Sequence, residues 1–238
     1  MPRLPLPILL SFNGGYVDTV GFVALAGLFT AHVTGNFVTL GASIALGTGG
    51  ALSKLVALPV FCMVIMLVRL LSQWLERSRK PVMTVLLWLK LVLFAIAATF
   101  AEVHGPFDDG SSLAAFAAGM ILVAAMAIQN AFHRVHLSKM PPTTLMTGTT
   151  TQIMLDLADL IGGLAQGDLK PVKERLKRMS ASVLAFAHGC AAAAVAFLLS
   201  RTWCFAVPVA LGALSLFASV RPPEKASIEA PLDSAHTE

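Results

Sequence analysis

The stretch LFTAHVTGNFVTLG, residues 28–41, places four hydrogen-bonding side chains within seven positions of an otherwise apolar region. They are Thr30, His32, Thr34 and Asn36. A helix that crosses a membrane needs about 20 mostly apolar residues, and a polar side chain inside the hydrocarbon core is costly unless it has a partner. The stretch therefore decides whether the chain crosses the bilayer here or interrupts its path.

Composition places the rest of the chain in a membrane. Hydrophobic residues make up 56% of the 238 positions and charged residues only 13%, which excludes an ordinary soluble domain. Long apolar runs recur without the alternating pattern of a β-barrel, so we expect an all-α integral membrane protein. The first run has the length of a signal peptide, but Asn13 and Asp18 interrupt it, which favours a retained first helix.

Loop charge indicates how many apolar stretches cross the bilayer. Eight stretches can be marked, at about 7–27, 31–47, 54–74, 82–101, 112–132, 143–164, 181–200 and 203–220. If all eight cross, nine basic loop residues lie inside and six outside; the run from Lys170 to Arg178 is treated as a loop in this count. If the second and sixth enter and return, the division becomes thirteen to two. Because Lys and Arg concentrate in cytoplasmic loops, we expect six transmembrane helices, two re-entrant or broken segments, and both termini in the cytoplasm.

The two non-crossing stretches resemble each other. TAHVTGN at 30–36 and TTLMTGT at 143–149 share three of seven residues at an offset of 113. The spans around them fall in the same order, which predicts one membrane domain, residues 1–220, made of two inverted-topology repeats at about 7–101 and 112–220. Residues 221–238 form a polar, disordered tail. Inverted repeats with interrupted helices are typical of transporters, whose sites lie where the interrupted pieces meet.

Residues 13–41, NGGYVDTVGFVALAGLFTAHVTGNFVTLG, and 127–152, AIQNAFHRVHLSKMPPTTLMTGTTTQ, resemble the YoaK-like family of bacterial membrane proteins, a domain family of unknown function. The first block is the more specific, with Gly-x-x-Asp followed sixteen residues later by Thr-Gly-Asn. The resemblance implies a multi-pass protein of the bacterial inner (plasma) membrane. It implies no substrate.

Polar residues of the interrupted segments and of the spans before them are the candidates for binding a solute. Two half-helix N-termini that meet inside the membrane would suit an anion or a polar solute, with Thr34 or Asn36 capping the first. The alternatives are that the glycines and threonines only allow close packing and that the amides only join helices. The candidates are Asp18, Thr34, Gly35, Asn36, Asn130, Thr147 and Gly148.

Three further residues are candidates for intramembrane charge or proton transfer, namely Lys90, His32 and His188. Lys90 lies about ten residues into its stretch, too deep to reach the interface easily, and is a conceivable partner for the carboxylate of Asp18. A purely structural bridge between them would leave the same pattern. Each histidine is equally compatible with a packing role.

No enzyme signature, metal site or phosphate loop occurs in the sequence. We expect no cofactor, no metal and no nucleic acid, with the lipid bilayer and a small solute as partners and a homo-oligomer allowed. The sequence thus predicts a transporter or channel for a small polar or anionic solute. The alternatives are a membrane-embedded accessory protein without transport activity and a membrane-embedded enzyme, which a metal held by Asp18, His32 and His188 would favour.

Overall fold

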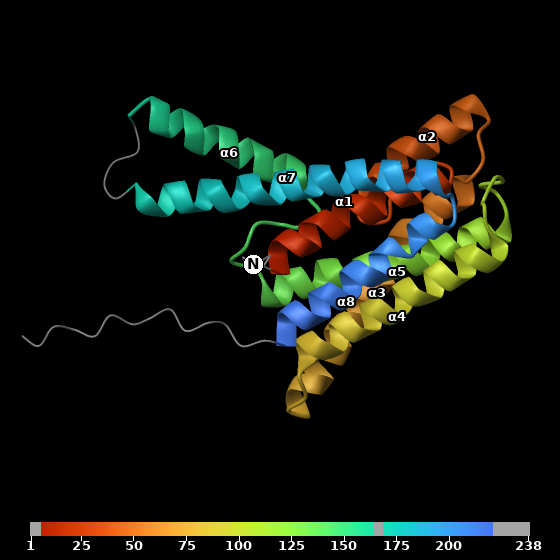
Figure 1. The fold of residues 1–238 in the computed structure, drawn as a ribbon, viewed down its shortest axis with the longest axis horizontal. Helices are drawn as coiled ribbons and strands as arrows, with labels where there is room; N and C mark the ends of the chain where they lie inside the picture. The colour runs from red at the N-terminus through yellow and green to blue at the C-terminus, as the bar shows by residue number, and fades with distance from the viewer. Residues whose placement is uncertain (1–5, 164–168, 221–238) are drawn as a thin grey trace, which may run out of the picture.

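A computed structural model describes residues 6–163 and 169–220, and these ranges contain helices and turns but no strand. The predicted all-α fold is confirmed, whereas the predicted tail at 221–238 lies outside the described residues. The elements, which Figure 1 shows in chain order, are α1 (Leu6–Ala24), η1 (Val33–Gly35), α2 (Asn36–Leu46), α3 (Ala51–Arg77), α4 (Val82–His104), α5 (Leu113–His136), α6 (Met146–Ile161), α7 (Lys170–Leu199), η2 (Trp203–Phe205) and α8 (Val207–Val220).

Four of these helices, α3, α4, α5 and α7, are long and apolar enough to cross a membrane. They contain the predicted stretches 54–74, 82–101, 112–132 and 181–200 except for two end residues, Ser112 and Ser200. Much of their outer surface is apolar; on α3 the exposed side chains include Met63, Met66, Leu67, Leu70 and Trp74. Apolar helix faces that no other part of the protein covers are suited to contact with lipid. The chain therefore has the construction of a membrane protein.

The helix α7 begins earlier than the sequence analysis expected. The basic run from Lys170 to Arg178 is helical and forms the first turns of α7 rather than a loop. Pro171 lies in the first turn, where its missing N–H removes no helical hydrogen bond, and the Lys, Glu, Arg and Leu residues after it favour helix. The expectation of a loop was wrong because this polar segment is itself a good helix-forming sequence.

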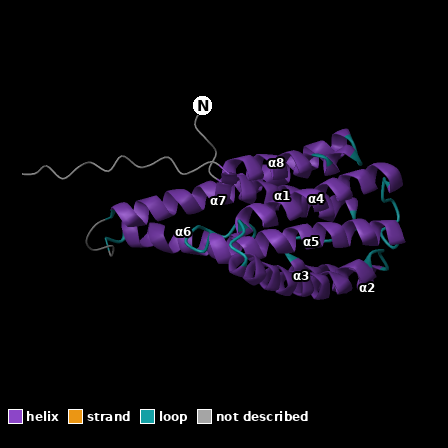
Figure 2. Ribbon diagram, turned by 90° about the horizontal axis from the view of Figure 1, so that it is seen from below, coloured by secondary structure: helices purple, strands orange, loops and turns teal. Residues whose placement is uncertain are grey.

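The long helices form one elongated bundle (Figures 1 and 2). In Figure 1, α1, α4 and α7 run from left to right, while α3, α5 and α8 run back. The short helices α2 and α6 stand apart from this bundle near its two ends, α2 packing on α3 and α6 on α7. The interrupted segments of the sequence are thus the two elements that do not run along the bundle.

The closest packing in the bundle is between α1 and α7, which cross at two glycines. A Cβ atom on Gly15 would lie 2.1 Å from the carbonyl oxygen of Phe186, and one on Gly189 would lie 2.1 Å from the carbonyl oxygen of Phe12. Such distances are far below van der Waals contact, so only glycine permits this approach. The contact fixes α1, which carries Asp18, against α7.

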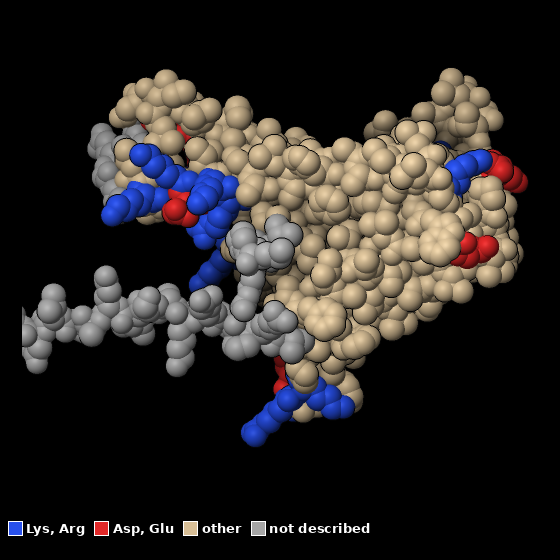
Figure 3. Space-filling model, in the orientation of Figure 1, with Lys and Arg blue, Asp and Glu red and all other residues tan. Residues whose placement is uncertain are grey.

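Charged side chains lie at the ends of the bundle, and the surface between them is almost free of charge in Figure 3. Lys and Arg gather at the turn between α3 and α4, with Arg77, Arg79 and Lys80, and at the first turns of α7. The opposite end carries Glu102, Asp108 and Asp109, with Arg201 paired to Asp108 at 2.6 Å. The two ends of the molecule therefore differ in charge.

Candidate functional site

The stretch 28–41 is not one continuous helix. The helix α1 ends at Ala24, and positive φ angles at Ala26 (52°) and Gly27 (82°) then turn the chain back toward the middle of the bundle. Helical structure resumes only at Val33, in η1, and continues into α2. Leu25 and Gly27 still donate to the carbonyl oxygens of Gly21 and Phe22, but the backbone N–H groups of residues 28–32 continue no helix, and in a buried position they need other partners.

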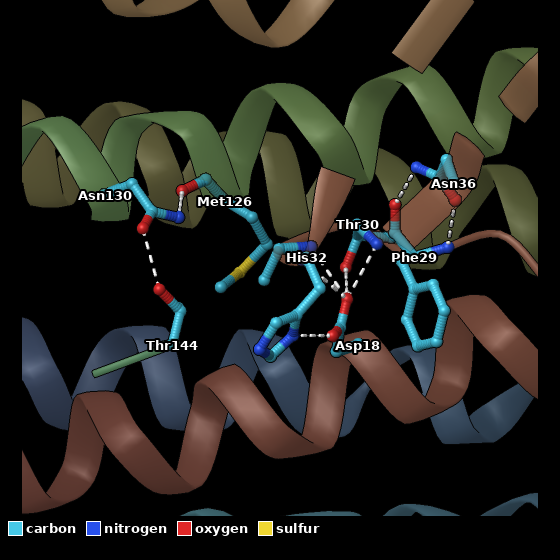
Figure 4. Close-up of polar contacts among 9 residues, drawn as sticks. Asp18, Phe29, Thr30, His32, Asn36, Met126, Asn130 and Thr144 are labelled. Carbon is cyan, nitrogen blue, oxygen red and sulfur yellow. Dashed lines mark hydrogen bonds and ion pairs between the residues drawn. The ribbon is translucent and has the colours of Figure 1, made fainter. Parts of the chain in front are cut away.

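The carboxylate of Asp18, on α1, supplies those partners (Figure 4). Its Oδ1 accepts hydrogen bonds from the backbone N–H groups of Thr30 (2.8 Å) and Ala31 (2.7 Å), and more weakly from that of His32 (3.4 Å). Its Oδ2 lies 2.5 Å from Nδ1 of His32. Asp18 is buried, so the carboxylate occupies the place that an anion would take among these N–H groups.

Asn36 closes the same segment from its other end. Its Oδ1 accepts a hydrogen bond from the backbone N–H of Phe29 at 2.8 Å, and its Nδ2 donates one to the carbonyl oxygen of Phe29 at 2.8 Å (Figure 4). Asn36 is 1% exposed. The predicted capping role for Thr34 or Asn36 does not occur, since neither η1 nor α2 has a side-chain cap. Asn36 acts as a clamp across the loop instead.

Asn130, on α5, makes a similar contact with the second interrupted segment. Its Oδ1 accepts a hydrogen bond from the hydroxyl of Thr144 at 2.7 Å, while its Nδ2 donates to the carbonyl oxygen of Met126 at 3.0 Å. Figure 4 shows this pair beside the group formed by Asp18 and His32. A polar residue of one long helix therefore holds each interrupted segment.

Two cavities share lining residues in this segment. One, of about 540 Å³, is lined by Asp18 and Thr19 of α1 and by Phe186 and Cys190 of α7. The other, of about 420 Å³, is lined by side chains of α3 and α5, including Asn130. His32 and Thr34 line both cavities. The polar segment thus separates two hollows on opposite pairs of helices, and Gly35 lines the first of them.

The second set of candidates lies apart from this centre. Leu145, just before α6, lines the 420 Å³ cavity, but Thr147 faces a separate open groove on α6 with Thr150 and Thr151. Gly148 is exposed, and a Cβ atom there would meet nothing within 4 Å. The structure therefore brings together Asp18, His32, Thr34, Gly35 and Asn130 and leaves Thr147 and Gly148 outside.

Lys90 has a partner other than Asp18. It is 1% exposed, and its Nζ donates to Oε1 of Gln129 at 2.6 Å. The same oxygen accepts a hydrogen bond from Nδ2 of Asn13 (3.0 Å), and Nε2 of Gln129 donates to the hydroxyl of Thr143 (3.3 Å). Lys90 thus belongs to a hydrogen-bond network of uncharged partners that reaches the second interrupted segment, whereas Asp18 contacts the first.

His188 does not join either group. It is exposed on α7, and its Nδ1 lies 2.7 Å from the carbonyl oxygen of Leu184 on the same helix. Within residues 6–163 and 169–220 no three His, Cys, Asp or Glu side chains are grouped as metal ligands. The arrangement of Asp18, His32 and His188 that would favour a metalloenzyme is therefore not formed.

Sequence reasoning missed two arginines that line the 420 Å³ cavity, Arg69 of α3 and Arg134 of α5. The signal for Arg69 was present, because an arginine inside an apolar stretch is a functional candidate on the same grounds as Lys90. Arg134 carried no such signal, since it stands beside His133 and His136 at the end of a predicted span.

Comparison with known proteins supports the resemblance carried by residues 13–41 and 127–152. The family model described as "Protein of unknown function (DUF1275)" matches residues 6–218, which is nearly the whole described chain. No curated protein and no solved structure matches the chain. The YoaK-like proteins are this same family. The chain therefore belongs to the DUF1275 family of proteins of unknown function.

Proposed function

We propose that this protein moves a small polar or anionic solute across the bacterial inner membrane along a path centred on His32 and Thr34. The observation that carries the proposal is the meeting of the 540 Å³ and 420 Å³ cavities at His32 and Thr34. Irregular backbone inside a membrane protein is tolerated where protein or a water-filled cavity surrounds it. A polar segment with a cavity on each side supplies groups that bind the solute and also separates the two cavities from each other.

Six crossings form the frame of this path. The opposite directions of α1, α4, α7 and of α3, α5, α8 support six passes along the bundle (Figure 1). The segment that contains α2 leaves and rejoins the bundle at the end where α1 stops and α3 starts, and α6 lies likewise between the end of α5 and the start of α7. Both segments are then re-entrant.

Two inverted repeats, α1 to α4 and α5 to α8, account for the packing. In this arrangement each helix of the first half corresponds to the helix four places later, α1 to α5 and so on. Exchanging the halves then turns the contact of α1 with α7 into that of α5 with α3, and the contact of α2 with α3 into that of α6 with α7. The contact of α4 with α5 becomes that of α8 with α1, and α4 with α8 maps onto itself. In this exchange the cavity beside Asp18 corresponds to the cavity beside Asn130.

Charge supports the orientation. The end of the bundle that carries the turn between α3 and α4 and the start of α7 holds most of the described Lys and Arg residues (Figure 3). We assign this end to the cytoplasm, because basic residues in short loops are retained there. The start of α1 and the end of α8 lie at the same end, so both termini are cytoplasmic in this orientation.

The polar segment offers a solute two hydrogen-bonding side chains, His32 and Thr34. Asp18 takes the backbone N–H groups of residues 30–32, which leaves the second ring nitrogen of His32 and the hydroxyl of Thr34 facing the cavities. Apolar rings of Phe22, Phe29 and Phe186 surround them. Few polar groups in a mostly apolar pocket are typical of small-molecule sites.

Cysteine accessibility tests the path. The three free cysteines, Cys62, Cys190 and Cys204, are replaced by alanine, and T34C is treated with a small membrane-impermeant thiol reagent in inside-out and right-side-out vesicles. We expect T34C to react from at least one side. The control V92C, in the middle of α4 where the side chain is 46% exposed on the outer surface, lies in lipid in this orientation and is expected to stay unreactive.

The outcome separates the alternatives. If T34C is unreactive from both sides while the variant remains folded, the central path does not exist and an accessory role without transport is favoured. If T34C reacts, uptake of radiolabelled metabolites by cells with and without the gene identifies the solute, and modification of T34C is expected to reduce that uptake.

A further inference from the structure

Two arginines, both exposed, line the 420 Å³ cavity from the two helices that form its walls. Arg69 projects from α3 and Arg134 from the last turn of α5. Arg69 stands eight residues before the end of α3 at Arg77, which is about 12 Å along the helix. It therefore lies deeper than the basic residues of the turn between α3 and α4.

Neither arginine has a counter-charge in the described part of the chain. The ion pairs there join Asp18 with His32, Asp156 with Arg175, and Asp108 with Arg201. No Asp or Glu lines the cavity. A cation inside the membrane without a partner is costly, so paired positive groups that face a cavity favour an anion within it.

We infer that the cavity between α3 and α5 binds an oxyanion, a carboxylate or phosphate group, through Arg69 and Arg134. The guanidinium group presents N–H donors in a planar fork that matches two oxygens of either anion. Phe61, Ile65 and Val68 form apolar walls, which strengthen an electrostatic contact by excluding water. The inference rests on the proposed function, and it names the class of solute as anionic.

The anion site adjoins the central segment. His32 and Thr34 line the inner part of the same cavity, and no hydrogen bond engages the Thr34 side chain in the described structure. Of the other polar side chains in the cavity, Ser72 donates its hydroxyl to the carbonyl oxygen of Val68, and Asn130 is engaged by Thr144. The groups left for an anion are thus the two guanidinium groups, the Thr34 hydroxyl and the second ring nitrogen of His32. An anion held by the arginines would lie beside the barrier between the two cavities.

Inorganic phosphate and succinate serve as probes for purified full-length protein in a nonionic detergent. Thermal unfolding, followed by the fluorescence of Trp74, Trp88 and Trp203, is measured against probe concentration at constant ionic strength. We expect a saturable rise in Tm with at least one probe, because a ligand that binds only the folded state stabilises it. R69Q and R134Q are each expected to weaken that binding roughly tenfold or more.

Matched variants separate binding from general charge and from folding. R77Q and R79Q remove exposed arginines outside the cavity and are expected to retain the Tm response. R69K keeps the positive charge but loses the planar set of guanidinium N–H donors, so we expect it to bind the probe with an affinity between those of the natural protein and R69Q. If the probe raises the Tm of R69Q and R134Q as much as that of R77Q, the inference is overturned. It is also overturned if neither probe raises the Tm saturably and R69Q and R134Q keep their bound lipid.

A lipid headgroup carries the same phosphate chemistry as a free anion. Lipid that stays bound through purification is therefore quantified, and the Tm is measured in nanodiscs of phosphatidylglycerol and of phosphatidylcholine. If R69Q and R134Q, but not R77Q, lose bound phosphatidylglycerol, the site is an oxyanion site that a lipid fills. If they lose neither lipid nor probe binding, the site does not exist. These results are independent of the T34C labelling, so failure of the anion site and failure of the central path are distinguishable.

Discussion

Nδ1 of His32 lies 2.5 Å from Oδ2 of Asp18, and the other oxygen of that carboxylate accepts the backbone N–H groups of Thr30 and Ala31. One side chain of α1 thereby fixes both the backbone and the imidazole of a segment that has no helix of its own. The position of His32 between the two cavities depends on this contact.

Removal of the Asp18 carboxylate is expected to release the segment. D18A leaves two buried N–H donors without an acceptor, so the free energy of unfolding should fall by about 2–4 kcal/mol. D18N retains one acceptor oxygen and should lie between D18A and the natural protein. Thermal unfolding in detergent measures the order, with T99A on the exposed side of α4 as a control expected to change little. A Tm for D18A equal to that of the natural protein would contradict the role assigned to Asp18.

The clamp made by Asn36 predicts a second effect on the same segment. N36A removes an acceptor from the N–H of Phe29 and a donor from its carbonyl oxygen, so a loss of about 1–3 kcal/mol is expected. The matched control is T39A, three residues along α2, where the hydroxyl makes only a 3.4 Å contact with the carbonyl oxygen of Asn36. Equal unfolding midpoints for N36A and T39A would show that the clamp contributes nothing.

The crossing of α1 and α7 predicts an unusual cost for a small substitution. G189A places a methyl group 2.1 Å from the carbonyl oxygen of Phe12, which the helices can relieve only by moving apart. We expect the free energy of unfolding to fall by about 1–3 kcal/mol or more. G41A, on α2 where a Cβ atom meets nothing within 4 Å, should be neutral or stabilising because alanine favours helix. A mild G189A together with a damaging G41A would contradict this packing.

The contact of α6 with α7 predicts a dependence on acid. Arg175 holds the pKa of Asp156 below its usual range, first through hydrogen bonds to the carboxylate (2.9 and 2.7 Å) and further through its charge. Because the pKa of Asp156 is lower in the folded state than in the unfolded state, the ion pair stabilises the fold fully at pH values above the ordinary carboxyl pKa. This stabilisation is lost as the pH falls through the lowered pKa of the folded state.

A double-mutant cycle of D156N and R175Q, followed by thermal unfolding, measures this coupling. It should be favourable at pH 7 and shrink as the solution becomes acidic. R175Q alone is expected to cost more than the double variant, because it leaves a buried carboxylate without its cation. A coupling that stays constant as the pH falls would show that the pair does not act in this way.

The sequence predicted the helices and the interruption but not the contacts of the interrupted segment. Residues 54–74, 82–101 and 112–132 are predominantly apolar, so their hydrophobicity predicts helices. The polar residues at 30–36 likewise marked a break, because no spanning helix tolerates them without partners. The pairing of Asp18 depended on a turn at Ala26 and Gly27 that brings Thr30 back beside α1. Such tertiary contacts are not encoded in local periodicity.

The second half of the candidate site shows the same limit. Thr147 and Gly148 repeat the motif of Thr34 and Gly35, yet α6 packs mainly along α7 and carries them away from the centre. The repeat was visible in the sequence, whereas the placement of α6 depends on contacts such as that of Asp156 with Arg175, 19 residues apart. A motif match therefore located the second break but not its distance from the first.

Lys90 and Gln129 predict opposite effects for two substitutions in one network. The Lys90 ammonium group is buried with a neutral partner, so its desolvation is only partly offset. K90M removes that charge and still leaves Gln129 Oε1 with a donor from Asn13, so stability is expected to change by less than about 1.5 kcal/mol or to rise.

Q129L is the matched variant. It leaves Lys90 without an acceptor, leaves Asn13 with only the weak acceptor Sδ of Met126, and frees the hydroxyl of Thr143, so a loss of several times the usual 1 kcal/mol per hydrogen bond is expected. Unfolding midpoints of the two single variants and of the double variant test this. The double variant should be more stable than Q129L alone, because it no longer contains the unpaired ammonium group. A double variant less stable than Q129L would mean that Lys90 contributes a favourable contact independent of Gln129.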